Sequence, residues 1–463
     1  MSNVRNFGAV GDGAFDDTDA VQHAVDQGDG VVELPRGTYR ITRPIEIDLE
    51  RVGTLGVAGA RGTARIVMAG PGPALRVTGH HGGTALPSSV QPLVWQSERM
   101  PQISGLEIVG DHPEADGIQL VRTMQATLTG LLIRNVRHGV HLPERNRNVL
   151  IHGCHIYDNS GIGIYFDQCN IHQGIIAANH ISYCKLAGIK SVGGDLHNVH
   201  ITGNDIEYNY DENAEGAADV WFESAGGRNS EVTIASNTIQ AIASKGGTNV
   251  RIIGSPTDPP RDAPLFAISG NVIGSQETNI ELSLVNRVSI TGNNLYEGKT
   301  VTVDARDSRN VTLSGNAFGW DVPGREPAGG IRLVRCQNVA ITGQVMESDR
   351  LGDADAGGAV TLEECERVSV TGCQIHAPHQ RGLWLKDCRY CNISGNTVVG
   401  GEAVPMRTAI ELRGGRDNLV QGNVVGAGSG GAIVADEGAA SVDGNLVAFG
   451  EEQRSRGAKE QRD

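Results

Sequence analysis

The sequences GIGIYFDQC at 161–169, AGIKSVGG at 187–194 and ADVWFES at 218–224 share one alternating pattern. When the three sequences are aligned so that Gly163, Gly188 and Asp219 share one position, Ile164, Ile189 and Val220 share the next position. Apolar side chains fill every second position, and polar or aromatic side chains lie between them. Because a β-strand points successive side chains to opposite faces, this pattern predicts stacked strands with one buried and one exposed face.

The pattern continues from residue 100 to residue 449. Strands are expected to begin at Gly117, Gly139, Gly163, Gly188, Asp219, Asn249, Asn279, Thr300, Gly330, Ala359, Gly382, Ala409 and Ala432. A second strand in each repeat ends near an asparagine, at Asn179, Asn204, Asn237, Asn271, Asn293, Asn316, Asn396, Asn423 and Asn445, with interruptions at Gln344 and Cys373. Repeats of roughly 21 to 31 residues match one coil of three short strands, so we expect an all-β, single-stranded parallel β-helix of about 13 or more coils.

Composition agrees with this fold and limits the partners. Glycine supplies 63 of 463 residues and aromatic residues only 4%, a balance that suits short strands joined by tight turns. The net charge of -15 opposes nucleic-acid binding, which needs a basic surface.

The first residues, MSNVRNFGAV, lack the pattern of a classical signal peptide, and we expect a cytoplasmic protein without a membrane span. The polar segment 451–463 is expected to be disordered.

The segment FGAVGDGAFDDTDAVQHAVD at 7–26, followed by VVELPRGTY at 31–39, resembles the opening of the pectate-lyase-like right-handed parallel β-helix superfamily. That superfamily includes polygalacturonase-like hydrolases, lyases, uronan epimerases and phage tailspikes. The resemblance implies one β-helix domain over 1–450, with a short helix near 17–27 covering its first coil. In this superfamily the Asp-rich opening is structural, which implies no catalytic role for Asp12, Asp16 or Asp17.

The exposed face of the quoted repeats mixes aromatic, cationic and acidic side chains. Tyr165, Lys190 and Trp221 share one outward column and are suited to bind sugar rings and hydroxyls. Asp167 and Glu223 share the next column two strands apart, roughly 9.6 Å. Because inverting glycoside hydrolysis needs two carboxyls separated by room for a water, we predict Asp167 as base and Glu223 as acid.

A second candidate group surrounds the long turn YNYDENAEGA at 208–217. Long turns beside an exposed column often carry function. Catalytic candidates here are Glu207 and Asp219, and substrate-binding candidates are Tyr208 and Asp211. His172, which we place at a turn, is a further substrate-binding, acid or base candidate.

These residues predict a carbohydrate-active enzyme that cleaves or transfers a glycosidic bond of a poly- or oligosaccharide. One alternative is a polysaccharide lyase or uronan epimerase using Lys190 and Tyr165, and another is a non-catalytic tailspike-like fibre. No metal ligands are assigned and no cofactor is expected, since no acidic cluster at calcium-ligand spacing occurs within one repeat. NIELSLVNRVSITGNNLYEG at 279–298 resembles the repeats of inulin fructotransferase, a trimeric β-helix enzyme, which implies a transferase and a homotrimer.

Overall fold

A computed structural model describes residues 2–83, 85–257, 259–319, 329–347, 350–352, 357–402 and 406–448. The chain forms two compact units, Met1–Ser244 with Gly254–Ala263, and Lys245–Ile253 with Pro264–Asp463. The one domain predicted over 1–450 stays a prediction. The predicted disordered segment 451–463 lies outside the described residues. Among the described residues, no helix has the length and apolar character needed to span a bilayer.

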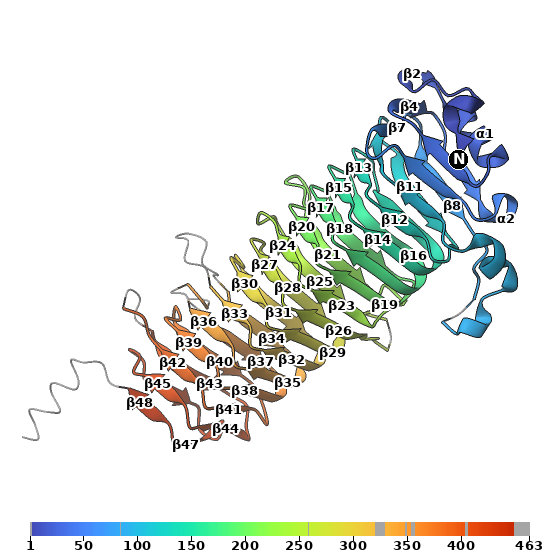
Figure 1. The fold of residues 1–463 in the computed structure, drawn as a ribbon. Coiled ribbons are helices and arrows are strands. Elements are labelled where there is room, and N and C mark those ends of the chain that lie inside the picture. Colours follow the sequence, from blue (N-terminus) through green and yellow to red (C-terminus); the bar gives the residue numbers. More distant parts are fainter. Residues whose placement is uncertain are drawn as a thin grey trace, which may run out of the picture. The chain divides into compact units, whose positions relative to one another are not determined.

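The first unit consists of parallel strands stacked in three ladders (Figure 1). Ladder one contains β5 (Ile45–Asp48), β8 (Gly72–Thr78), β11 (Ala115–Val121), β14 (Val140–His152), β16 (Ile162–Ala177), β18 (Ala187–Val192) and β21 (Ala218–Glu223). Ladder two contains β1 (Ser2–Asn3), β3 (Val31–Leu34), β6 (Gly56–Gly59), β9 (Gln102–Ser104), β12 (Thr127–Thr129), the second halves of β14 and β16, β19 (Asp195–Thr202), β22 (Arg228–Asn229) and β23 (Val232–Ala235). Ladder three contains β2 (Asp12–Asp16), β4 (Gly37–Ile41), β7 (Ala64–Met68), β10 (Leu106–Gly110), β13 (Leu132–Arg134), β15 (His155–Tyr157), β17 (His180–Ser182), β20 (Asp205–Glu207) and β24 (Thr238–Gln240).

The second unit repeats this arrangement. Its ladder one contains β25 (Thr248–Ile253), β28 (Thr278–Ser283), β31 (Val301–Arg306), β34 (Ile331–Val334), β37 (Val360–Glu363), β40 (Arg381–Lys386), β43 (Thr408–Arg413) and β46 (Ile433–Ala435). Ladder two contains β26 (Ala263–Ser269), β29 (Val285–Thr291), β32 (Arg309–Ser314), β35 (Gln337–Thr342), β38 (Glu366–Thr371), β41 (Asn392–Ser394), β44 (Asn418–Gln421) and β47 (Ala440–Asp443). Ladder three contains β27 (Val272–Gly274), β30 (Asn294–Tyr296), β33 (Ala317–Phe318), β36 (Val345–Glu347), β39 (Gln374–His376), β42 (Thr397–Val399), β45 (Val424–Gly426) and β48 (Leu446–Ala448).

The predicted parallel β-helix is therefore confirmed, and so is the alternation in the quoted repeats. Ile164 pairs with Ile189, and Ile189 pairs with Val220. These three side chains are fully buried, as are the inward aromatic rings Phe166 and Phe222. Burial of such branched and aromatic side chains from every coil supplies the main stabilisation of the unit.

The asparagines form an internal hydrogen-bonded ladder. Asn204 donates from its backbone N and its Nδ2 to Oδ1 of Asn237, at 2.9 and 3.0 Å, and its own Oδ1 accepts the equivalent pair from Asn179. Gln344 was predicted to interrupt the series of asparagines. It continues the ladder of the second unit instead, because its Oε1 accepts from Asn316 Nδ2 at 3.0 Å. Cys373 lacks an amide, but its backbone N still donates to Asn396. The ladder thus satisfies backbone groups at the bend that β-pairing leaves without partners.

Helix α1 (Thr18–Gln27) confirms the helix predicted near 17–27. Its buried residues include Ala20, Val21, Ala24 and Val25, which form one apolar stripe. The Asp17 side chain does not cap this helix and instead accepts from the backbone N of Val10 and Gly11, at 2.6 and 3.0 Å. The short helical segments η1 (Val4–Phe7), α2 (Leu49–Val52), η2 (Pro87–Ser89) and η3 (Val94–Glu98) lie in the same unit.

The eight cysteines are buried and free. Cys336, Cys365 and Cys388 donate from Sγ to carbonyl oxygens of the neighbouring coil at 3.3 to 3.4 Å. These contacts give the thiols a packing role inside the second unit.

Candidate functional site

An outward column of side chains crosses ladder one of the first unit. Register pairing places one residue from each of seven successive strands in it: Glu46, Arg76, Gln119, His141, Tyr165, Lys190 and Trp221. We call these seven residues the outward column. Side chains in such a column are neighbours because adjacent parallel strands lie about 4.8 Å apart.

Hydrogen bonds within the outward column orient His141. Arg76 Nε donates to Gln119 Oε1 at 2.6 Å, so the amide NH2 of Gln119 faces His141 Nδ1 at 3.1 Å. Since that amide nitrogen can only donate, Nδ1 is the acceptor and the proton of the neutral imidazole is on Nε2. His141 Nε2 lies 3.1 Å from Asp167 Oδ2. The column therefore presents an N–H donor to Asp167.

Asp167 receives a second donor from Tyr165. The phenol Oη donates to Asp167 Oδ1 at 3.1 Å. Burial, followed by the charge of Asp167, raises the pKa of Tyr165 to about 12, so the phenol keeps its proton. With one donor on each oxygen, the Asp167 carboxylate is fixed in orientation at the surface, where its side chain is 36% exposed.

A cluster of rings packs behind this carboxylate. His141 stacks on Tyr165 with centroids 5.4 Å apart, and His138 lies 5.2 Å from Tyr165. Burial lowers the pKa of His138 to about 4, and its Nδ1 accepts from Ile162 N at 3.3 Å. The folded protein therefore holds His138 as a neutral imidazole beside Tyr165.

This lowered pKa predicts acid sensitivity. A histidine that titrates near 6.5 when unfolded and near 4 when folded gives stability above pH 6.5 that is lost as the pH falls towards 4. We expect the urea midpoint of the wild-type protein to fall over this window, and His138→Gln to make the fall shallower. His81, which is buried with a pKa of about 4, should supply a residual slope. An unchanged slope in His138→Gln would contradict this assignment.

Lys190 and Trp221 form the next part of the outward column. Lys190 Nζ lies 3.3 Å from the centroid of the Trp221 ring, a cation–π contact. Lys190 is only 9% exposed. One face of the indole is therefore covered by the ammonium group, and a sugar ring would have to use the rest of the Trp221 surface.

Asp167 and Glu223 lie in the adjoining column, with Val192 between them. Both carboxylates contribute to the raised pKa of Tyr165, after burial, so Tyr165 lies within the electrostatic field of each. Two strand spacings amount to roughly 9.6 Å, and the longer Glu223 side chain can lean towards Asp167. The register thus places the two residues two strands apart in one column, and a carboxyl separation that admits a water stays a prediction.

The second candidate group does not form one site. Asp219 is 1% exposed, and its Oδ1 accepts from Asn209 Nδ2 at 3.0 Å inside the coil. Asp211 accepts from Asn213 N within the turn. Tyr208 stacks on Tyr183, with centroids 5.6 Å apart, beside a hollow of about 330 Å³. Burial makes Asp219 a structural acceptor, whereas Tyr208 lines a separate surface.

His172 lies inside strand β16 rather than at a turn, because β14 and β16 continue through the bend into ladder two. It pairs in register with Arg147 and His197. Its Nε2 lies 3.4 Å from Asn198 Nδ2. His172 thus belongs to a different ladder from Tyr165 and Lys190.

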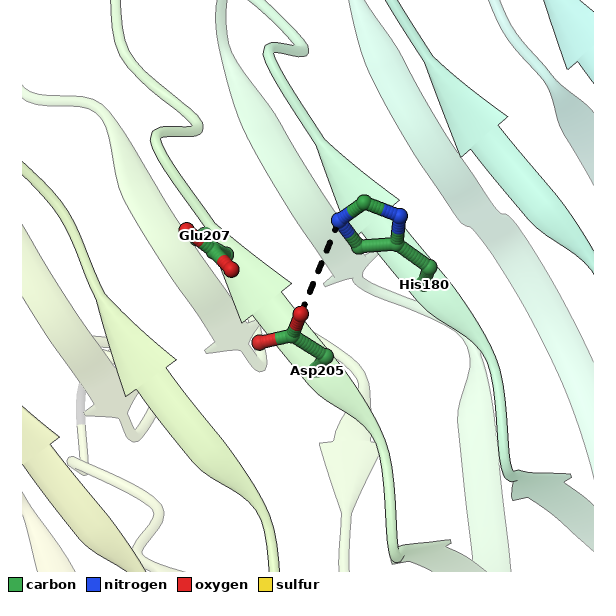
Figure 2. Close-up of side chains that lie close together, drawn as sticks. All are labelled: His180, Asp205 and Glu207. Carbon is green, nitrogen blue, oxygen red and sulfur yellow. Dashed lines mark ion pairs between the residues drawn. The ribbon is translucent and has the colours of Figure 1, made fainter.

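One group was missed in the sequence analysis: His180, Asp205 and Glu207 gather on ladder three (Figure 2). His180 Nε2 lies 3.6 Å from Asp205 Oδ2. The repeat itself contains the signal, because His180 and Asp205 each follow an asparagine of the ladder, Asn179 and Asn204, and therefore share a register position. Of these three residues, the sequence predicted a role only for Glu207, as a catalytic candidate beside the long turn at 208–217.

Family models match most of the chain. The model for a right-handed β-helix region matches residues 93–239 and 278–447. A second model, rhamnogalacturonase A/epimerase, pectate lyase-like, matches residues 1–63. The resemblance of the opening segment to the pectate-lyase-like superfamily is thereby confirmed.

Curated relatives match only a short stretch. Alginate lyase 7 and mannuronan C5-epimerase AlgE3, both of Azotobacter vinelandii, are each 54% identical over 44 residues, which is 9% of this chain and 5% and 2% of theirs. The chain thus spans a small fraction of those proteins.

Solved structures share the fold over nearly the whole chain. The tailspike protein of Escherichia coli bacteriophage HK620, solved with a pentasaccharide, has a TM-score of 0.56 at 14% identity and covers 89% of this chain and 78% of its own. The Dettilon tailspike protein has a TM-score of 0.52 at 17% identity, covering 94% and 68%. At such identities the likeness concerns the fold alone, and together with the family models it leads to one conclusion: this chain belongs to the right-handed β-helix family.

Proposed function

We propose that the protein is a carbohydrate-active enzyme that cleaves or transfers a glycosidic bond, with Asp167 as the ionised catalytic base and Glu223 as the acid. The observation that carries the proposal is the pair of donors on Asp167, one from His141 and one from Tyr165. These two donors hold the Asp167 carboxylate in place and leave it partly exposed. A catalytic base needs this exposure to reach the water that it activates.

The neighbouring side chains suit a poly- or oligosaccharide. Trp221 and Lys190 lie on the same outward face, one strand apart, and bring apolar surface and a hydrogen-bond donor together. A sugar chain crossing strands β16, β18 and β21 would contact Asp167 at one end and Glu223 at the other. Glu223 would donate its proton to the leaving oxygen, and Asp167 would take a proton from the attacking water.

A second candidate is a lyase or epimerase acting on an acidic sugar. It is favoured by Lys190, which lies in register between Tyr165 and Trp221 and can bind a sugar carboxylate. Tyr165 or Lys190 would then be the base that takes the proton next to the sugar carboxylate. The short matches to an alginate lyase and a mannuronan epimerase agree with this chemistry.

A product assay separates the two. Purified protein is incubated with neutral and uronate-containing glycans, and reducing ends, 235 nm absorbance and anomeric configuration are recorded. Reducing ends without absorbance, in inverted configuration, support hydrolysis through Asp167 and Glu223. Absorbance at 235 nm identifies the unsaturated product of a lyase. Binding of a glycan with no change in it would replace the enzyme proposal by a tailspike-like binding role.

A further inference from the structure

His180, Asp205 and Glu207 offer three ligand atoms in one place. Strands β17 and β20 pair so that His180 is opposite Asp205, and Glu207 follows two residues later on the same face. One nitrogen and two carboxylate oxygens, one per residue, all lie within 4.8 Å of one another (Figure 2). All three side chains are partly exposed, so an ion has access from solvent.

Within the part of the chain that the structure describes, no arginine or lysine forms an ion pair with Asp205 or Glu207. In the described residues, the only ion pair of Asp205 or Glu207 is the one with His180. Glu107, in the same ladder, shows the usual alternative: it lies between Arg65 and Arg134, at 2.6 and 2.9 Å.

The neighbours orient this group. Gln240 Nε2 donates to Glu207 Oε2 at 3.3 Å. The ring of His155 meets that of His180 edge-on, with centroids 5.8 Å apart. Partners of this kind hold metal ligands in fixed orientations and raise affinity.

We propose that His180, Asp205 and Glu207 bind a divalent transition-metal ion such as Zn²⁺. An imidazole nitrogen with two carboxylate oxygens is a donor set that zinc accepts, whereas calcium and magnesium prefer oxygen ligands alone. Three protein ligands leave at least one coordination position for water. The ion would join β17 to β20 and cancel the two negative charges.

The test uses the full-length protein freed of metal with a chelator and titrated with Zn²⁺ by calorimetry at pH 7.5. The wild-type protein should bind about one equivalent that Asp205→Asn and His180→Gln lose. The matched control is His376→Gln, which removes the His376–Glu347 pair of the second unit and should leave that equivalent intact. No Zn²⁺ uptake by the wild-type protein, or uptake unchanged in both site variants, would overturn the proposal.

Two further measurements guard against misfolding and non-specific uptake. Circular dichroism should be the same for the metal-free wild-type protein and its variants, while Zn²⁺ should raise Tm only where His180, Asp205 and Glu207 are intact.

Gln240→Leu, which keeps all three ligands, should weaken Zn²⁺ binding by roughly 10-fold. Equal binding of Ca²⁺ and Zn²⁺ would show that the imidazole does not ligate and would refute the assignment.

Discussion

Asp167→Asn is expected to lower glycan turnover by roughly 100-fold or more with little change in folding. Asparagine keeps the size of the side chain and can still accept from Tyr165, but it can neither take a proton nor attack carbon. The His141 contact should weaken because the charge is gone. Turnover under saturating glycan, with urea unfolding in parallel, measures both effects.

Two further variants complete this experiment. Glu223→Gln separates hydrolysis from lyase chemistry, and Glu46→Gln is the control for loss of a carboxyl outside the proposed site. If hydrolysis uses both carboxyls, Glu223→Gln should also lose roughly 100-fold, and the double variant should be little worse than either single one. If the protein is a lyase, Tyr165→Phe should be damaging and Glu223→Gln mild. Glu46, which pairs with Arg76 at the far end of the outward column, is a matched carboxyl whose amide should stay within about twofold of wild type. Near-normal turnover in Asp167→Asn would remove it from the mechanism.

Asn204→Leu is expected to destabilise the first unit by about 3 kcal/mol or more. Leucine is similar in shape but leaves Asn179 N without its acceptor and takes the Asn204 donor from Ile176 O. Asn179 Nδ2 loses one of its two acceptors and keeps Ile151 O. Each buried polar group without a partner costs about 1–3 kcal/mol, and these groups are fully inside the coil. Denaturant unfolding monitored by circular dichroism gives the change in unfolding free energy.

Asn170→Leu is the control for this effect. Asn170 lies in β16 of the same unit, but its side chain is only half-buried and belongs to the exposed face. Its replacement should change the free energy of unfolding by less than about 0.5 kcal/mol. Similar losses at Asn204 and Asn170 would mean that the ladder adds nothing beyond general packing.

The sequence predicted the elements that depend on a repeated local rule. Alternation around Ile164 and Phe166 predicted which face is buried, and the recurring asparagines predicted where a second strand of each coil ends. Both follow from backbone periodicity, which every coil repeats. The prediction for Gln344 was wrong because its longer amide reaches the same acceptor position as asparagine.

Contacts between long side chains were less predictable. The column pattern brings Lys190 next to Trp221, but only side-chain rotamers decide that the ammonium lies over the indole. Likewise, the tautomer of His141 depends on a hydrogen bond from Gln119 that involves a strand of another repeat. Asp219 was proposed as catalytic from its place beside the long turn, whereas its first-strand position turns the carboxylate inward onto Asn209.

The turn at 208–217 leaves the stacking around it intact. On one side β20 keeps its register with β17, and on the other β21 keeps its register with β18, although ten residues intervene. The register of one ladder is thus independent of the chain length that connects it to the next. Such a scaffold accepts insertions of new loop sequence at its bends, so a recognition loop can be grafted, exchanged or lengthened there while the strands beneath it stay in place.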